Sequence, residues 1–217
     1  GIFHLATNAS CSPTFINCTI MGNYAVSGGG VAFIGINGTS NSSYTNCLFY
    51  QNHAEDGGAF YSYGILNSIF TNCTFAYNSA ANDGGSLYVD YGNSNFSIAN
   101  CIIWGNANYY GYEPQMELGS YNNLTISNSI VQSAWSLGYN NFTSNVYNLG
   151  NLIDNDPLFV DPANGNYNLA TGSPAINAGN NALIPYSIST DIIGNPRVVN
   201  DIVDMGVYEA PCQMSAS

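Results

Sequence analysis

The sequence has almost no basic side chains. Lysine and arginine together number one, Arg197, against 13 aspartates and glutamates, which gives a formal net charge of −12. Nucleic acids and anionic membrane surfaces are bound through basic faces, so we expect neither as a partner. Charged residues make up only 6% of the chain, and its solubility must therefore depend on amide and hydroxyl groups.

Long apolar runs are also missing. No stretch approaches the ~20 residues of a membrane-spanning helix, so we expect no membrane insertion. No signal peptide stands at Gly1, which suits a processed or truncated chain. A disordered chain is poor in aromatic residues, whereas this one has 17 tyrosines and 10 phenylalanines. Its 217 residues are enough for one elongated domain with a continuous core.

The cysteines and histidines lack the spacing of a metal site. Zinc sites need closely paired ligands, whereas the six cysteines are spread along the chain and His4 and His53 lie far apart. Neither histidine belongs to a recognisable catalytic triad. The even number of cysteines favours an oxidising compartment. We expect no cofactor, with calcium as the one candidate metal, discussed below.

A short motif with Asn-Cys at its centre recurs along the first half of the chain. The four asparagines are 29, 26 and 28 residues apart, and a fifth copy with serine in place of cysteine follows after another 28 residues. The copies occupy residues 15–19, 44–48, 70–74, 98–102 and 126–130. Periods of roughly 20 to 50 residues are typical of solenoid proteins.

The rest of each repeat indicates short strands and corners. An apolar-x-x-Asn step follows the motif, and a glycine pair with a short apolar strand comes next in the first three copies. β-Branched and aromatic residues alternate between Gly, Asn and Ser, without a helical stripe. The pattern predicts an all-β, right-handed parallel β-helix with coils of about 28 residues. Stacked coils would align identical side chains, with asparagines hydrogen-bonding from coil to coil at a bend.

We expect three segments along the chain. The coils occupy residues 1–132, a connection rich in tyrosine and asparagine follows at 133–150, and a C-terminal cap of strands and loops takes 151–217.

Two parts of the chain resemble known families. The apolar-x-x-Asn and Gly-Gly-apolar alternation resembles the repeats of chlamydial polymorphic outer-membrane proteins and related bacterial β-helix surface proteins. The C-terminal third resembles the choice-of-anchor Q domain through residues 156–162, 172–179, 194–197 and 204–209. These resemblances imply a secreted or cell-surface protein of bacterial type, in families whose function is usually unassigned.

Four cysteines occupy the same place in the repeat and should form a ladder across the coils: Cys18, Cys47, Cys73 and Cys101. Neighbouring coils are spaced within the about 4.4 to 6.8 Å that separates the Cα atoms of a disulfide, so pairing of adjacent coils is one hypothesis. The other, which we favour, is that they are free thiols at an inward position.

The acidic residues of the C-terminal third have two expected roles. We expect Arg197 to form an ion pair with Asp204 or Glu209, or with Asp191, and so to stabilise the cap. Three aspartates around Asp-Pro turns carry the oxygen ligands that Ca²⁺ prefers, although turn formation explains them as well: Asp154, Asp156 and Asp161.

Carboxylates near the glycine pairs suggest glycoside hydrolysis, which uses two such groups. Glu55, Asp56, Asp83 and Asp90 recur there, but they are also ordinary turn residues, and we favour this interpretation. β-Helix lyases use a basic residue as proton acceptor, and the coil region has no lysine or arginine. We therefore predict that the protein is not an enzyme and has no catalytic residue.

Tyrosines that follow the glycine pairs offer a different role, because aromatic rings stack on sugars. The residues are Tyr61, Tyr63, Tyr88 and Tyr91. Tyrosine ladders also stabilise a sheet, so both interpretations stay open. If the host glycosylates the protein, the best acceptors are in loop-like Asn-x-Ser/Thr triplets, at Asn37, Asn41 and Asn141.

The start of the chain aligns with the inside of a coil, so the first coil is expected to present an open edge of unpaired strands. Docking of another copy's C-terminal region on this edge would give head-to-tail filaments. A disulfide between Cys11 and Cys212 could join the subunits, although we favour free or intrachain cysteines at these positions. We predict an extracellular structural protein that assembles into such filaments. The alternative is a monomeric cell-surface adhesin or glycan-binding fragment of a longer protein, and a polysaccharide-degrading enzyme ranks third.

Overall fold

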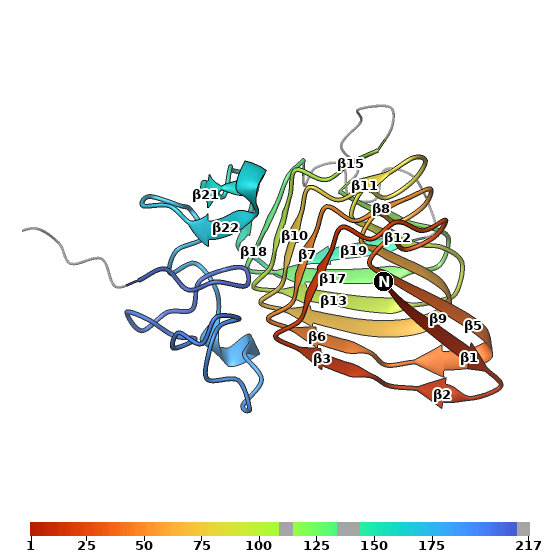
Figure 1. The fold of residues 1–217 in the computed structure, drawn as a ribbon. Helices are drawn as coiled ribbons and strands as arrows, with labels where there is room; N and C mark the ends of the chain where they lie inside the picture. The colour runs from red at the N-terminus through yellow and green to blue at the C-terminus, as the bar shows by residue number, and fades with distance from the viewer. Residues whose placement is uncertain (109–114, 134–143, 212–217) are drawn as a thin grey trace, which may run out of the picture.

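The computed structural model describes residues 1–108, 115–133 and 144–211. In this part of the chain the regular structure consists of short strands and two 3-10 turns, and no helix is long and apolar enough to cross a membrane. The coils stack side by side, and their strands pair in parallel with the equivalent strands of the next coil (Figure 1). The prediction of an all-β parallel solenoid is confirmed.

Two sides of the solenoid form one continuous sheet of 11 strands. Face A contains β1 (Ile2–Thr7), β12 (Leu87–Val89), β16 (Met116–Leu118) and the first halves of β5 (Val31–Ser40) and β9 (Phe60–Thr71). Face B contains the end of β9 together with β3 (Thr14–Ile16), β6 (Ser43–Thr45), β13 (Asn95–Ala99), β17 (Asn123–Ser127) and β19 (Asn145–Asn148). The short β2 (Ser10–Cys11) pairs with the end of β5. The two faces are continuous because β9 bends through the corner between them.

Face C is a separate sheet on the third side of the solenoid. Its strands are β4 (Thr19–Met21), β7 (Leu48–Tyr50), β10 (Thr74–Ala76), β14 (Ile102–Trp104), β18 (Ser129–Val131) and β20 (Leu152–Ile153). A small sheet then precedes the return to face A, with the strands β8 (His53–Ala54), β11 (Ser79–Ala80) and β15 (Ala107–Asn108).

The corners explain the residues that the repeat keeps. Asn46, Asn72 and Asn100 turn the chain from face B to face C with φ angles of 51°, 52° and 53°, in the left-handed region that asparagine tolerates. Before face A, Gly57 has a φ of 64°, and a Cβ atom on Gly58 would collide with a carbonyl oxygen of the next coil. Glycine is therefore the residue that fits both positions.

Side chains of one kind stack along the axis inside the solenoid. The rings of Phe15, Tyr44 and Phe70 have centroids 5.0 and 4.8 Å apart, and Phe49 stacks on Phe75 at 4.6 Å. A row of side-chain amides runs beside them, in which each Nδ2 donates to the amide oxygen of the next residue: Asn23, Asn52, Asn78, Asn106 and Gln115. Each coil thus contributes similar apolar burial, ~1.5–3 kcal/mol per large side chain, and similar hydrogen bonds.

The solenoid is longer than the sequence predicted. Strands β19 and β20 continue faces B and C by pairing with β17 and β18, so the coils extend to Ile153 and not to residue 132. The last step between coils is 22 residues on face B, from Asn123 to Asn145, and 23 on face C, from Ile130 to Ile153, where earlier steps are 26 to 29. This coil also lacks the Asn-Cys motif and the glycine pair, which hid it from the repeat pattern. Residues 144–150, predicted as part of a connection, belong to this coil.

Residues 154–211 form an irregular C-terminal region that packs on face C (Figure 1). Tyr167 and Val207 pack there against Leu48 and Ala76. The strands β7, β10, β14 and β18 of face C are therefore covered on both sides, whereas Thr19 and Met21 of β4 stay exposed. The region contains one antiparallel pair and two short turns: β21 (Phe159–Asp161), β22 (Asn166–Leu169), η2 (Pro162–Asn164) and η3 (Asn181–Leu183).

Candidate functional site

An outward row of face A brings tyrosines of neighbouring coils together. Successive side chains of a strand alternate between core and surface, and the register places Ala32, Tyr61, Tyr88 and Glu117 in one row. The ring centroids of Tyr61 and Tyr88 are 5.8 Å apart. Three further tyrosines, 44%, 55% and 52% exposed, follow face A on the way to face B: Tyr63, Tyr91 and Tyr121. We call these five residues the tyrosine face.

Carboxylates surround the two inner tyrosines of this face. The hydroxyl of Tyr61 donates to Oδ2 of Asp90 over 3.1 Å. Burial and then the charge of Asp90 raise the pKa of Tyr61 and of Tyr88 well above the usual value. Smaller contributions to the pKa of Tyr88 come from Asp83, Glu117 and Asp56. The phenol groups therefore stay protonated as donors, and the carboxylates offer acceptors beside them.

This combination of groups suits carbohydrate chemistry. Exposed rings can stack on the apolar faces of sugars, and carboxylates and phenols can pair with sugar hydroxyls. The coil region has no lysine or arginine to balance an acidic ligand. The site would thus bind neutral or amino sugars and repel sugar acids.

Sequence reasoning found much of this face. The structure brings the predicted tyrosines together with Asp56, Asp83 and Asp90, whereas Glu55 is not among the charges that act on Tyr61 or Tyr88. Glu117 and Tyr121 were missed because their coil lacks the glycine pair that marks the others. The alternation of Met116, Glu117 and Leu118 was the available signal for an outward carboxylate.

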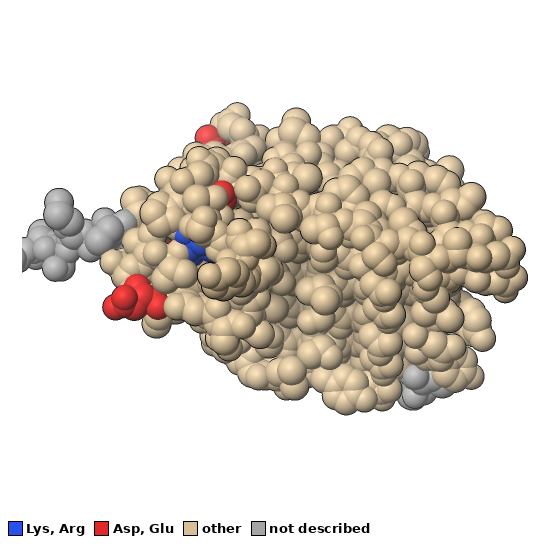
Figure 2. Space-filling model, turned by 90° about the horizontal axis from the view of Figure 1, so that it is seen from below, with Lys and Arg blue, Asp and Glu red and all other residues tan. Residues whose placement is uncertain are grey.

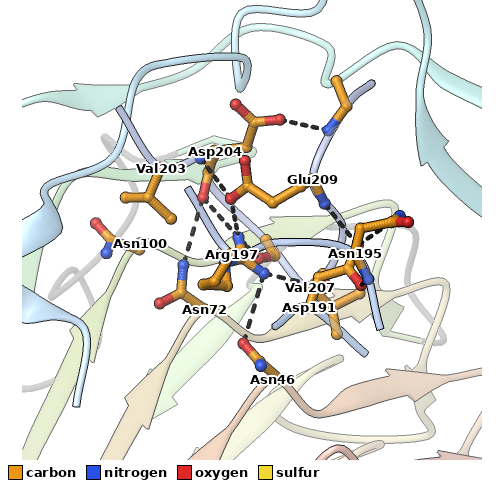
Figure 3. A network of polar contacts seen from close by, with 12 residues as sticks. Asn46, Asn72, Asn100, Asp191, Asn195, Arg197, Val203, Asp204, Val207 and Glu209 are labelled. Carbon is orange, nitrogen blue, oxygen red and sulfur yellow. Dashed lines mark hydrogen bonds and ion pairs between the residues drawn. The ribbon is translucent and has the colours of Figure 1, made fainter. Parts of the chain in front are cut away.

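The single arginine is buried in the C-terminal region (Figure 3). Nη2 of Arg197 lies 2.9 Å from Oε1 of Glu209. The guanidinium meets Asp204 at its backbone oxygen, 3.0 Å away, and not at its carboxylate. That carboxylate accepts instead from the backbone N–H groups of Asn177 and Ala210, both at 2.7 Å. Of the three predicted partners, Glu209 thus forms the ion pair.

Three buried carboxylates face this one guanidinium. Asp191, Asp204 and Glu209 are each at most 2% exposed. Burial raises the pKa of Glu209 to about 8, although the attraction of Arg197 acts to lower it. Burial also raises the pKa of Asp204. Burial thus outweighs the attraction of Arg197 and favours the protonated form of Glu209.

The same network ties the C-terminal region to the asparagine corner of the solenoid. Nδ2 of Asn46, Asn72 and Asn100 donates to the backbone carbonyl groups of Thr190, Asp204 and Asn180. Of these corner amides, Asn46 also donates to Asn17 of the preceding coil. The sequence predicted that stacked asparagines bond from coil to coil at a bend, and the buried row of Asn52, Asn78 and Asn106 does so.

The repeat cysteines are thiols along the core. Cys47, Cys73 and Cys101 are fully buried, Cys18 is half-buried, and no disulfide joins any of them. The buried thiols donate to the carbonyl oxygen two residues earlier, at 3.2 to 3.4 Å. Burial, followed by the neighbouring thiols, raises the pKa of Cys73. Cys73 therefore stays protonated at neutral pH, whereas its hydrogen bond with Cys47 lowers the pKa of the Cys47 thiol.

The calcium candidates are not brought together. Asp154 accepts from the backbone N–H of Ser133, Asp156 from that of Leu158, and Asp161 from the side chain of Asn164. Within the described ranges no three acidic, histidine or cysteine side chains are arranged to hold a metal ion. The three aspartates act separately, in their own turns.

Two predicted surface residues, Cys212 and Asn141, lie outside the described residues. Cys11, the proposed partner of Cys212, is a half-buried free thiol in the first coil. The other two glycosylation candidates, Asn37 and Asn41, are exposed.

Comparison with known proteins bears on the fold. Neither the curated proteins nor the solved structures include a match to this chain. The family described as the right handed beta helix region matches residues 1–183, which include all the described coils and the first part of the C-terminal region. The chain belongs to this right-handed β-helix family.

Proposed function

We propose that this protein is an extracellular, cell-surface β-helix that binds glycans through its tyrosine face without cleaving them. The observation that carries the proposal is the gathering of five tyrosines from neighbouring coils on one side, three of them 44% to 55% exposed. Exposed aromatic groups of this kind mark binding surfaces. The resemblance to choice-of-anchor Q domains and to chlamydial surface repeats supports the location.

Binding without cleavage is supported by the state of the carboxylates. Asp90, nearest to both inner tyrosines, already accepts from the hydroxyl of Tyr61 and from the backbone N–H of Tyr91 at 2.8 Å. A general acid or base must be free to exchange a proton with the substrate. The coils also lack the basic proton acceptor of a lyase.

Glycan arrays followed by titration calorimetry test this proposal. The protein should bind neutral or amino sugars and leave the glycan chain length unchanged. The variant Tyr88→Ala should bind about tenfold more weakly, which is about 1.4 kcal/mol. Tyr186→Ala is the matched control, because Tyr186 is a fully exposed tyrosine of the C-terminal region. Equal affinity of both variants, or release of shorter sugars, would contradict the proposal.

Head-to-tail assembly is the second candidate. It is favoured by the exposed apolar side chains of the first coil, which include Phe3 at 62%, Leu5 at 55% and Tyr24 at 76%. A second copy would bury them, as would a further coil of a longer chain. Sedimentation and electron microscopy with and without reductant test it: filaments that reductant weakens would support assembly joined through Cys11, and single rods at all concentrations would exclude it.

A further inference from the structure

Face B carries a groove that is separate from the tyrosine face. Its volume is about 370 Å³, within the roughly 300 to 1,000 Å³ of small-ligand sites. Figure 2 looks onto this side of the solenoid and shows no charged side chain over it, because the coloured atoms gather at the end formed by the C-terminal region. The lining consists of amides, hydroxyls and two apolar side chains: Asn41, Ser42, Ser43, Asn67, Ser68, Ile69, Asn95, Phe96, Ser97 and Thr125.

A ladder of amides runs along one side of the groove. Nδ2 of Asn67 donates to Asn41 at 2.9 Å, Asn95 to Asn67 at 3.0 Å, Asn123 to Asn95 at 3.1 Å and Asn145 to Asn123 at 2.9 Å. An amide nitrogen has two N–H groups, and these bonds use one of them. One donor per coil therefore remains for a ligand, at intervals of about 4.8 Å along the axis.

A second row, of outward side chains, lies beside the ladder. The register aligns Ser43, Ile69, Ser97, Thr125 and Tyr147 on successive coils. Ile69 is 53% exposed and Tyr147 is 51% exposed. The row thus presents three small hydroxyl side chains, at Ser43, Ser97 and Thr125, and two larger side chains with apolar surface, at Ile69 and Tyr147.

We propose that this groove binds a neutral glycan chain lying along the solenoid axis. A charged ligand would lose water without gaining a counter-charge. An apolar peptide would leave the ladder amides without partners. A neutral glycan meets both rows, because its hydroxyls recur along the chain and its ring faces are apolar. The site is distinct from the tyrosine face, and either could fail alone.

Affinity electrophoresis in gels that contain neutral polysaccharide tests the groove. The probes are a β-1,4-glucan, a β-1,4-mannan and a β-1,4-xylan. The double variant Asn67→Ala/Asn95→Ala removes two ladder amides, and Ser97→Asp adds a charge to the outward row. Each should weaken retention by at least one probe about tenfold. The matched control Asn164→Ala, an exposed amide of the C-terminal region, should run like the wild type.

Thermal unfolding of each variant shows that the fold is intact, and Ser97→Asp serves if the double variant unfolds. Full retention by folded groove variants would overturn the groove proposal, as would the absence of retention by every probe. If Tyr88→Ala loses binding while the groove variants bind like the wild type, the proposed function is supported and the groove proposal is rejected.

Discussion

The solenoid and the C-terminal region are stabilised in different ways. In the solenoid, successive coils repeat core positions, buried amides and corners, with aromatic stacks in the first three coils and aliphatic residues after them, so its stability is a sum of similar local contributions. The C-terminal region has one short antiparallel pair and depends on a single buried guanidinium among three acids. The outward residues of the regular faces can differ from coil to coil, so these faces suit binding. The irregular C-terminal region instead covers face C.

The largest effect is expected from the core of the solenoid. Phe70 is fully buried and contacts the rings of Tyr44, Phe49, Phe60 and Phe75. Phe70→Ala should lower the free energy of unfolding by about 3–5 kcal/mol, measured by urea denaturation. Its neighbour on the outer surface provides the control, since Ile69→Ala should change stability by less than about 0.5 kcal/mol. Equal losses of stability in the two variants would contradict the assignment of Phe70 to the core and of Ile69 to the outer surface.

Loss of Arg197 should destabilise the C-terminal region and leave the coils folded. Arg197→Leu leaves three buried acids without their cation, and loss of one member of a buried pair costs about 3–5 kcal/mol. Hydrogen exchange should then rise in residues 154–211 and stay slow in β9, β10 and β13. Equal loss of protection in the coils would show that the two regions unfold as one unit.

The buried amide row should show an intermediate effect. Asn78→Ala removes the acceptor for the backbone and side-chain N–H groups of Asn52. An unsatisfied buried group costs about 1–3 kcal/mol, which thermal unfolding should detect. Asn82→Ala removes an exposed amide that donates to Asp56, and it should be nearly neutral. A neutral Asn78→Ala variant would contradict the role given to this row.

The last test is the pH dependence of the C-terminal region. The pKa of Glu209 is raised from 4.5 to about 8, so its protonated form is the one that the folded state favours. This contribution is fully present below about pH 4.5 and is lost as the pH rises through about 8. The hydrogen-exchange rate of residues 154–211 should therefore rise between pH 5 and 9. The rise should exceed the increase that the base catalysis of amide exchange alone produces. Glu209→Gln keeps the carbonyl acceptor and should remove this excess, and an unchanged profile would contradict the assignment.

The sequence revealed the regular part of the molecule because a coil repeats its constraints. The Asn-Cys corner and the glycine pair recur since each coil needs the same backbone angles. The last coil escaped notice because its step is shorter and its corner lacks that motif. The ladder that begins at Asn41 and Asn67 has the same period as the corner, but asparagine is too common in this chain for the pattern to stand out.

In the C-terminal region, the sequence predicted little beyond the ion pair of Arg197, the single basic residue besides the histidines. A lone arginine must be neutralised when it is buried, which pointed to Asp204, Glu209 or Asp191, and the structure pairs it with Glu209. Its contacts with the carbonyl oxygens of Val207 and Gly206 come from backbone geometry that side-chain identities do not encode. The docking of the corner asparagines on this region has the same origin.

The most direct test of glycan binding by the regular faces is an NMR titration of the labelled protein with cellohexaose. We expect shifts in the side-chain amide signals of Asn67 and Asn95 or in the backbone signals around Tyr88, with residues 154–211 unchanged. Two results would contradict the account. One is a set of shifts confined to residues 154–211, and the other is the absence of any shift together with a failure of the polysaccharide probes to bind.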